Sequence, residues 1–221
     1  MRWSLCLVVA LATIATAQPR DERKEQQEAI DAIERLGGQV RYDYQRPTEK
    51  PNVFDPKAKP KNPKELHWVV MVSLRDTKVT DDDHKVLKKL PHLDNLDLTN
   101  TRISSAGLAH LRELKNLRML GLWKTQVGDS GMKHLEGLTK LWSLALDETS
   151  ISDAGLAHLK DLTSLENWLG LTHTKVTDEG IKYLTALTKL RHLNLRRTQV
   201  TATGIATLKS VLVNTDISFG P

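Results

Sequence analysis

Cysteine is nearly absent from this chain of 221 residues: the one cysteine, Cys6, lies in the apolar run near the N-terminus. Residues 1–17 have the pattern of a secretory signal peptide, with Arg2, that apolar run, and small residues at 15–17. The run is too short to span a bilayer comfortably, so we predict no integral membrane span. Cleavage would leave no cysteine, and therefore no disulfide and no thiol chemistry. We expect an exported bacterial protein, periplasmic, cell-surface or secreted, with a retained N-terminal anchor as the alternative.

The motifs of common catalytic and metal sites are also missing. There is no H-E-x-x-H, no G-x-S-x-G and no phosphate-binding glycine loop, and the aspartates at 81–83 lack the ligand spacing of a calcium loop. His110, His134 and His158 recur every 24 residues, but they fall on adjacent helices about 8–10 Å apart, too far to share one zinc ion. We read them as surface residues of the repeat, and we predict no cofactor, no metal and no enzymatic activity.

Charge of one sign is not concentrated. The formal charge of +5 falls to +4 once Arg2 is removed, and lysine and arginine are spread along the chain rather than clustered beside aromatic residues. Nucleic acid is therefore a poor candidate partner. The 39% hydrophobic content can bury one elongated core, and nothing in the composition requires a second globular domain.

What the chain does contain is a repeat. Six threonines recur at intervals of 24 or 25 residues, each within the pattern L-x-x-L-x-L-x-x-T-x-[IV]-x-x-x-G-[LIM]-x-x-L-x-x-L. They are Thr77, Thr101, Thr125, Thr149, Thr174 and Thr198. A period of this length indicates stacked units that cannot bury their apolar faces alone, and therefore a solenoid.

Each unit divides into a strand and a helix. The L-x-L core alternates with period two, as a half-buried strand requires, whereas Gly107, Leu108, Leu111 and Leu114 follow a three-residue helical spacing. Because every strand returns to the same side after a helical crossover, the strands must pair in parallel through right-handed connections. Six repeats at 67–212 therefore predict six parallel strands.

The pattern resembles the leucine-rich repeat family, in the branch that contains ribonuclease inhibitor and the arrays of F-box receptors. Residues 149–159 and 174–184 carry the resemblance most clearly. It implies an α/β leucine-rich-repeat solenoid, a right-handed horseshoe segment with a parallel sheet on the concave face and helices on the convex face. Many family members have asparagine where this chain has threonine, so we expect a column of hydroxyls bonded to neighbouring backbone groups. Residues 18–66 contain no recognisable F-box, so that role is not carried over.

Two further columns are predicted to be structural. Threonine, serine and aspartate mark the helix starts, where they suit unpaired N–H groups. These residues are Thr80, Ser104, Ser152, Thr177 and Thr201, followed by Asp81, Asp129, Asp153 and Asp178. The glycines at 107, 131, 155, 180 and 204 would allow close approach of helix and strand, and Asp83 departs from that column as a terminal repeat can.

Both flanks of the array are predicted to cover its ends. Residues 18–44 read as an N-terminal capping helix that stops at a glycine pair, followed by a short strand. Residues 45–66 read as an extended linker rich in proline and lysine. Residues 213–221 contain Ile217 and Phe219, 24 residues after two strand leucines, and predict a C-terminal edge strand.

The candidate binding residues flank the strand leucines and are expected to point to the concave side. They are Arg75, Asn95, Asp97, Thr99, Trp123, Asp147, Trp168, His192, Asn194 and Arg196. Trp123 is the preferred anchor because aromatic residues and arginine dominate interface energetics, although a surface tryptophan without a partner is the plain alternative. The repeat containing Trp168 has one extra residue, which predicts a bulge in the strand; Trp168 would then contact a partner or simply fill the register fault.

The resulting hypothesis is a non-enzymatic exported module that binds an unidentified protein through its concave sheet. The alternative is an envelope-structural protein whose basic linker and helices hold an anionic polymer. A third reading, a spacer or a fragment of a larger assembly, is less favoured because six repeats exceed the three or so that an independent solenoid needs.

Overall fold

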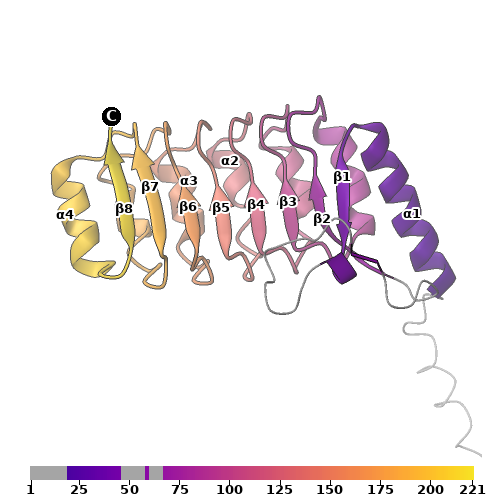
Figure 1. Ribbon diagram of the computed structural model, residues 1–221. Coiled ribbons are helices and arrows are strands. Elements are labelled where there is room, and N and C mark those ends of the chain that lie inside the picture. Colours follow the sequence, from indigo (N-terminus) through magenta and orange to yellow (C-terminus); the bar gives the residue numbers. More distant parts are fainter. Residues whose placement is uncertain (1–18, 46–57, 60–66) are drawn as a thin grey trace, which may run out of the picture.

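The computed structural model describes residues 19–45, 58–59 and 67–221 of the chain. The predicted signal peptide and nearly all of the predicted linker lie outside these residues. The described chain forms one sheet in which eight strands follow one another in sequence order, with the helical segments of the central repeats behind it (Figure 1). The strands are β1 (Gln39–Tyr42), β2 (Val69–Ser73), β3 (Asn95–Asp97), β4 (Met119–Gly121), β5 (Ser143–Ala145), β6 (Trp168–Gly170), β7 (His192–Arg196) and β8 (Asp216–Gly220).

The pairing of the repeat strands follows the sequence prediction. Strands β2 to β8 pair in parallel, and β1 pairs antiparallel with β2. Equivalent leucines stand opposite one another in successive strands, as Leu96, Leu120 and Leu144 do in β3, β4 and β5. These leucines are buried, as are the leucines two positions further along the chain, just after each strand. One continuous core therefore runs the length of the array.

The strand containing Trp168 has no bulge, contrary to the prediction. Ser143 pairs with Trp168 and Ala145 with Gly170 in an unbroken register. The extra residue lies in the segment before β6, where the Asn167 amide donates to the Trp142 carbonyl at 3.0 Å. An insertion costs less in a loop than in a strand, because the parallel ladder stays intact.

The helical half of each repeat is short. The helices are α1 (Pro19–Arg35), α2 (Asp129–Met132), α3 (Asp153–Leu156) and α4 (Ala202–Val211), and the 3-10 helices are η1 (Asp43–Gln45), η2 (Asp81–Lys89), η3 (Gly107–Leu111), η4 (Ala157–Leu159) and η5 (Ile181–Tyr183). Between β2 and β7 every helical segment is a 3-10 helix or a single turn of α-helix. From the three-residue spacing of Leu108, Leu111 and Leu114 we predicted an ordinary helix, but three residues per turn is the period of a 3-10 helix.

The threonine column closes the turn at the end of each strand. Thr101 Oγ1 donates to the Leu98 carbonyl and Thr125 Oγ1 to the Leu122 carbonyl, each at 2.7 Å. The residue before each threonine has a positive φ, as Asn100 does at 54°. The expected bonding of the hydroxyls to backbone is confirmed, but each partner lies in the threonine's own repeat.

The aspartate column links neighbouring repeats instead of capping its own helices. Asp153 Oδ1 accepts from the Thr177 amide at 2.8 Å, and Asp153 Oδ2 accepts from the Thr177 hydroxyl at 2.7 Å. We call this column, formed by Asp81, Asp129, Asp153 and Asp178, the aspartate ladder. At one position of this column serine replaces aspartate: there the Gly128 amide donates to Ser105 Oγ at 2.9 Å.

The glycine column makes room for this ladder. A Cβ added at Gly180 would overlap the Asp153 carboxylate and come within 3.1 Å of the Asp153 Cα. Gly107, Gly155 and Gly204 face Asp81, Asp129 and Asp178 in the same way. The predicted close approach is therefore real, but the neighbour is the aspartate of the preceding repeat and not a strand.

Helix α1 and strand β8 lie at the two ends of the array. Ala29, Ile30 and Ile33 of α1 are buried in the core. The Gln26 side chain bridges two backbone groups, donating to the His67 carbonyl and accepting from the Val69 amide, both at 2.9 Å. At the other end, β8 extends the sheet along β7.

Candidate binding groove on the sheet face

The outward side chains of the strands form what we call the sheet face. In three consecutive strands, the middle outward position holds a very small residue: Gly121 in β4, Ala145 in β5 and Gly170 in β6. The same position holds the larger Asp97 in β3 and Asn194 in β7. A groove of about 550 Å³ lies across these strands because its floor carries almost no side chains.

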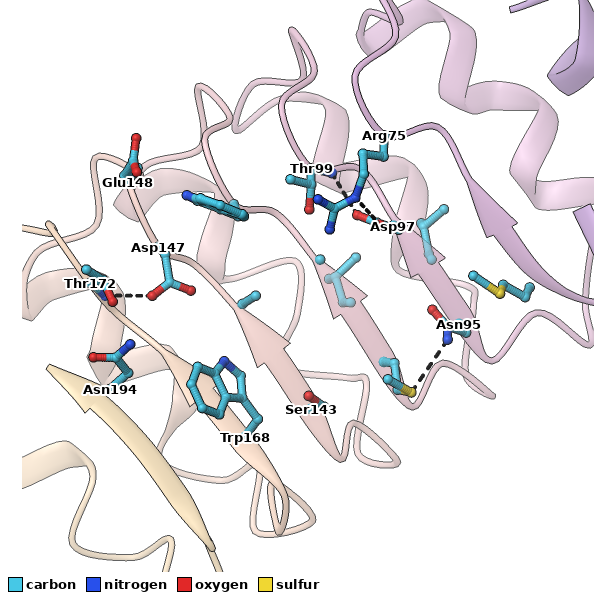
Figure 2. Close-up of a pocket in the computed structure, with 17 residues that line it drawn as sticks. Arg75, Asn95, Asp97, Thr99, Ser143, Asp147, Glu148, Trp168, Thr172 and Asn194 are labelled. Atoms are coloured by element: carbon cyan, nitrogen blue, oxygen red, sulfur yellow. Dashed lines mark hydrogen bonds and ion pairs between the residues drawn. The ribbon is translucent and has the colours of Figure 1, made fainter. Parts of the chain in front are cut away.

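We call this hollow the sheet-face groove. Its lining comes from β2 to β7 and the turns that follow these strands (Figure 2). The lining residues are Met71, Arg75, Asn95, Leu96, Asp97, Thr99, Met119, Leu120, Gly121, Trp123, Ser143, Ala145, Asp147, Glu148, Trp168, Thr172 and Asn194.

Two tryptophans border the groove. Trp123 follows β4 and is 41% exposed, one of the few large apolar side chains at the surface of the described chain. Trp168 begins β6 and is half-buried; its ring centre lies 6.3 Å from that of His192. Because the extra residue of this repeat lies ahead of the strand, Trp168 stays in register and faces outward. Figure 2 shows its ring on the sheet face, below Asp147.

Asp147 lies between the two tryptophans in strand order. Its Oδ1 accepts a hydrogen bond from the Thr172 amide at 2.9 Å (Figure 2). A Cβ added at Gly170 would overlap Asp147 Oδ2 and lie 2.8 Å from Trp168 Nε1, so both groups stand above this glycine. Within the described residues, neither Asp147 nor Glu148 forms an ion pair.

The opposite end of the groove is internally neutralised. Arg75 Nε lies 2.9 Å from Asp97 Oδ2, and Asp97 Oδ1 accepts from the Thr99 amide at 3.0 Å. Asn95 Nδ2 contacts Met119 Sδ at 3.5 Å. The free acidic character of the groove is therefore concentrated around Asp147 and Glu148.

The structure brings together most of the residues that the sequence nominated. Eight line the groove: Arg75, Asn95, Asp97, Thr99, Trp123, Asp147, Trp168 and Asn194. His192 and Arg196 are exposed and lie outside its lining; His192 Nδ1 is 3.6 Å from Asp216 Oδ2 on β8. Thr172 and Glu148 line the groove and were not predicted. Thr172 occupies the same column as Asp147 and Arg196, so the repeat alignment could have found it.

A second hollow of about 360 Å³ lies where the strands begin. It includes Trp68, His92, Asn116, Arg118 and Lys140. The Trp68 and His92 rings pack with their centres 4.2 Å apart, and Lys140 Nζ donates to Asn116 Oδ1 at 2.8 Å. Its side chains are largely engaged with one another, so it is the weaker candidate site.

The described residues contain no cluster of three or more potential metal ligands. The histidines at 110, 134 and 158 lie on the helical side, where His158 Nδ1 is 2.6 Å from Glu136 Oε1. No helix in the described part of the chain combines the length and apolar character needed to cross a membrane.

Comparison with known proteins gives one family match and several structural ones. Residues 186–209 match the family model described as Leucine Rich repeat. No curated protein matches the chain in sequence. An internalin (inlF) from Listeria monocytogenes is similar in structure, with a TM-score of 0.50 and 24% identity, over 68% of this chain and 46% of that one. The chain thus spans less than half the length of that internalin.

Two further structures align over almost their whole length. The leucine-rich repeat ectodomain of the receptor kinase SOBIR1 from Arabidopsis thaliana has a TM-score of 0.50 and 15% identity, with 90% of this chain and 97% of that chain covered. Internalin C2 (inlC2) from Listeria monocytogenes has a TM-score of 0.49 and 18% identity, with 93% of this chain and 99% of that chain covered. At these identities the likeness concerns the fold alone.

Proposed function

We propose that this chain, a leucine-rich repeat protein, binds another protein through the sheet-face groove and the strand surface around it. The supporting observation is that Trp123, 41% exposed, stands beside a groove whose floor is Gly121, Ala145 and Gly170. An accessible aromatic side chain next to a hollow is the arrangement found at the energetic centre of protein interfaces.

The shape of the groove favours a macromolecular partner. The groove is open and crosses several strands, from Met71 in β2 to Asn194 in β7. Small molecules are usually held in clefts that bury most of their surface, whereas an extended partner can follow an open face. Polar groups that fix orientation, including Asn95, Ser143 and Thr172, alternate with apolar contacts from Met119 and Trp168.

We further propose that the protein acts by binding without catalysis, and that it is exported. The support for export is the signal-like sequence at 1–17, which lies outside the described residues. Its partner would then be a protein of the cell envelope or of the outside medium.

The experiment uses two tryptophan substitutions. Trp142 lies immediately before β5, outside the groove lining, and has the Arg118 guanidinium 5.8 Å from its ring centre. Trp123→Ala and Trp142→Ala therefore remove the same side chain from two places. Purified protein beginning at Gln18 would be cross-linked to native envelope fractions. We expect a defined partner to be captured by wild type and Trp142→Ala, and capture by Trp123→Ala to fall about tenfold or more, as for an interface anchor.

Two results would count against the proposal. Equal capture by both variants would show that the sheet face around Trp123 does not bind the partner. Retention that falls steeply with salt and ignores both substitutions would favour the alternative, an envelope-structural role in which basic residues hold an anionic polymer.

A further inference from the structure

We infer that the partner presents a lysine or arginine side chain to the groove, and that its cation is held by the Asp147 carboxylate beside the two indole rings. The inference rests on the proposed function, because it specifies the chemistry of the partner at the same surface.

The charge of the groove favours a cation. The groove lining contains one cationic residue, Arg75, and three anionic ones, Asp97, Asp147 and Glu148. Arg75 and Asp97 pair with each other at 2.9 Å, which leaves two negative charges in the groove of a chain whose formal net charge is +5. A surface whose charge opposes that of the rest of the molecule selects and orients a partner of the matching sign.

Asp147 has unused hydrogen-bonding capacity. A carboxylate has about four acceptor positions. The Thr172 amide uses one of them on Oδ1, and this bond fixes the orientation of the side chain. Oδ2 stands over Gly170 in the floor of the groove, and Asp147 has no cationic partner within the described chain. An ammonium or guanidinium group from outside would supply the missing donor.

Aromatic rings stand close to this acceptor. Trp123 precedes Asp147 by one repeat in the same column, and Trp168 Nε1 lies near the same point above Gly170 as Asp147 Oδ2. Adjacent strands are about 4.8 Å apart, so these groups are within the span of one long side chain. A cation within about 6 Å of an indole centre is attracted to its face, and the methylene stem of lysine or arginine can pack along the same ring.

The floor explains why the cation would bind here and not elsewhere on the face. Ala145 and Gly170 leave depth next to Asp147, whereas larger side chains fill the same position in β3 and β7. Lys124 occupies the position equivalent to Glu148 one repeat earlier, outside the groove lining, and forms no ion pair in the described part of the chain. Asp147, whose Oδ2 stands over Gly170 in the floor, is therefore the principal acceptor.

The test uses four fluorescein-labelled peptides of about ten residues in which glycine alternates with lysine, arginine, glutamine or glutamate. Binding to wild type, Asp147→Asn and Asp161→Asn is measured by fluorescence anisotropy at low and moderate salt. Asp161 is an exposed aspartate on the turn after η4, outside the groove, so its variant carries the same change of charge. In Asp147→Asn the new amide oxygen could still accept the Thr172 amide bond, and thermal unfolding checks that each variant is folded.

We expect wild type and Asp161→Asn to bind the lysine and arginine peptides, and Asp147→Asn to bind them about tenfold more weakly, the loss typical of a charge-assisted contact. The glutamine and glutamate peptides should bind poorly to all three proteins. The inference is overturned if the glutamine peptide binds as well as the lysine peptide, if both variants lose affinity equally, or if the cationic peptides do not bind wild type at millimolar concentration.

Its failure can be told apart from failure of the proposed function. If envelope capture is lost in Trp123→Ala but unchanged in Asp147→Asn, the groove binds protein and the cationic contact is wrong. If Trp123→Ala has no effect on capture, the proposed function itself is wrong.

Discussion

The molecule contains the same pair of residues in two regions, with different consequences. On the helical side, Asp153 faces Gly180 of the next repeat; on the sheet face, Asp147 faces Gly170 of the next repeat. In both pairs an added Cβ on the glycine would overlap the carboxylate. The aspartate therefore occupies, in each case, space that only a glycine leaves open.

The two aspartates differ in how many of their hydrogen-bond acceptor positions remain free within the described chain. Both oxygens of Asp153 are used by Thr177, through its amide and its hydroxyl. Asp147 accepts a single hydrogen bond within the described chain, from the Thr172 amide. The ladder pattern continues at Asp178, where the Thr201 hydroxyl and amide hold the pKa of the carboxyl below its usual value. A satisfied aspartate builds the solenoid, whereas a partly satisfied one on an open face is available to a partner.

The largest expected effect concerns a buried polar residue. His84 stands in the first repeat, in the column that Leu108 and Met132 occupy later, and neither ring nitrogen forms a hydrogen bond of good geometry. Burial lowers the pKa of His84 to about 4, against the opposing effects of the Asp81 charge and the Gly107 backbone. Below a pH of about 6.5 the unfolded chain takes up a proton that the folded chain binds only near pH 4.

Stability should therefore fall as the pH is lowered through this window, by up to about 3 kcal/mol from His84 alone. His84→Leu should flatten the dependence between pH 6.5 and 4 and raise stability near neutral pH, because leucine needs no partner. Urea unfolding across this range measures both changes. A variant that keeps the slope of wild type would show that His84 is protonated as readily in the folded chain as in the unfolded one.

The next largest effect separates the two glycines. Gly180→Ala should destabilise the fold by about 2–3 kcal/mol, because the new methyl group would approach the Asp153 Cα, which is backbone and cannot swing away. Gly170→Ala should cost less, since it meets the ends of the Asp147 and Trp168 side chains on an open face. Gly137→Ala is the control, because its methyl group would meet only the end of the Lys115 side chain.

Thermal and urea unfolding would compare the three alanine variants. If Gly170→Ala proved as damaging as Gly180→Ala, the sheet-face pair would be as structural as the ladder pair. The distinction between the two regions would then be lost.

The smallest expected effect on stability comes from removing the carboxylates of Asp153 and Asp147. Asp153→Ala removes both acceptors that Thr177 uses and should cost about 1–2 kcal/mol, the usual penalty for leaving partly buried donors unpaired. Asp147→Ala should cost less than about 0.5 kcal/mol, because water can reach the single Thr172 donor at the groove. Denaturant midpoints at neutral pH give both values. An equal loss in the two variants would mean that Asp147 is held for stability.

Much of this architecture could be predicted because equivalent residues recur at the same position in every repeat. The buried strand leucines, the parallel order of the strands and the outward direction of Trp123 follow from column and period. Errors came where one residue had to be placed against a neighbour in space. The extra residue before Trp168 was assigned to a bulge, although the loop absorbs it. The aspartates were assigned to helix caps, although Asp153 and its equivalents bond the following repeat.

The sequence by itself determined the solenoid, its strand order and which side chains point outward, because burial of a regular apolar pattern allows only one register. Tertiary structure decided what those outward residues form together. Whether Asp147 retains a free acceptor, whether Gly170 opens a floor beneath it, and whether Arg75 is paired with Asp97 depend on contacts between repeats, 22 to 25 residues apart. Such contacts leave no periodic trace, because each occurs once.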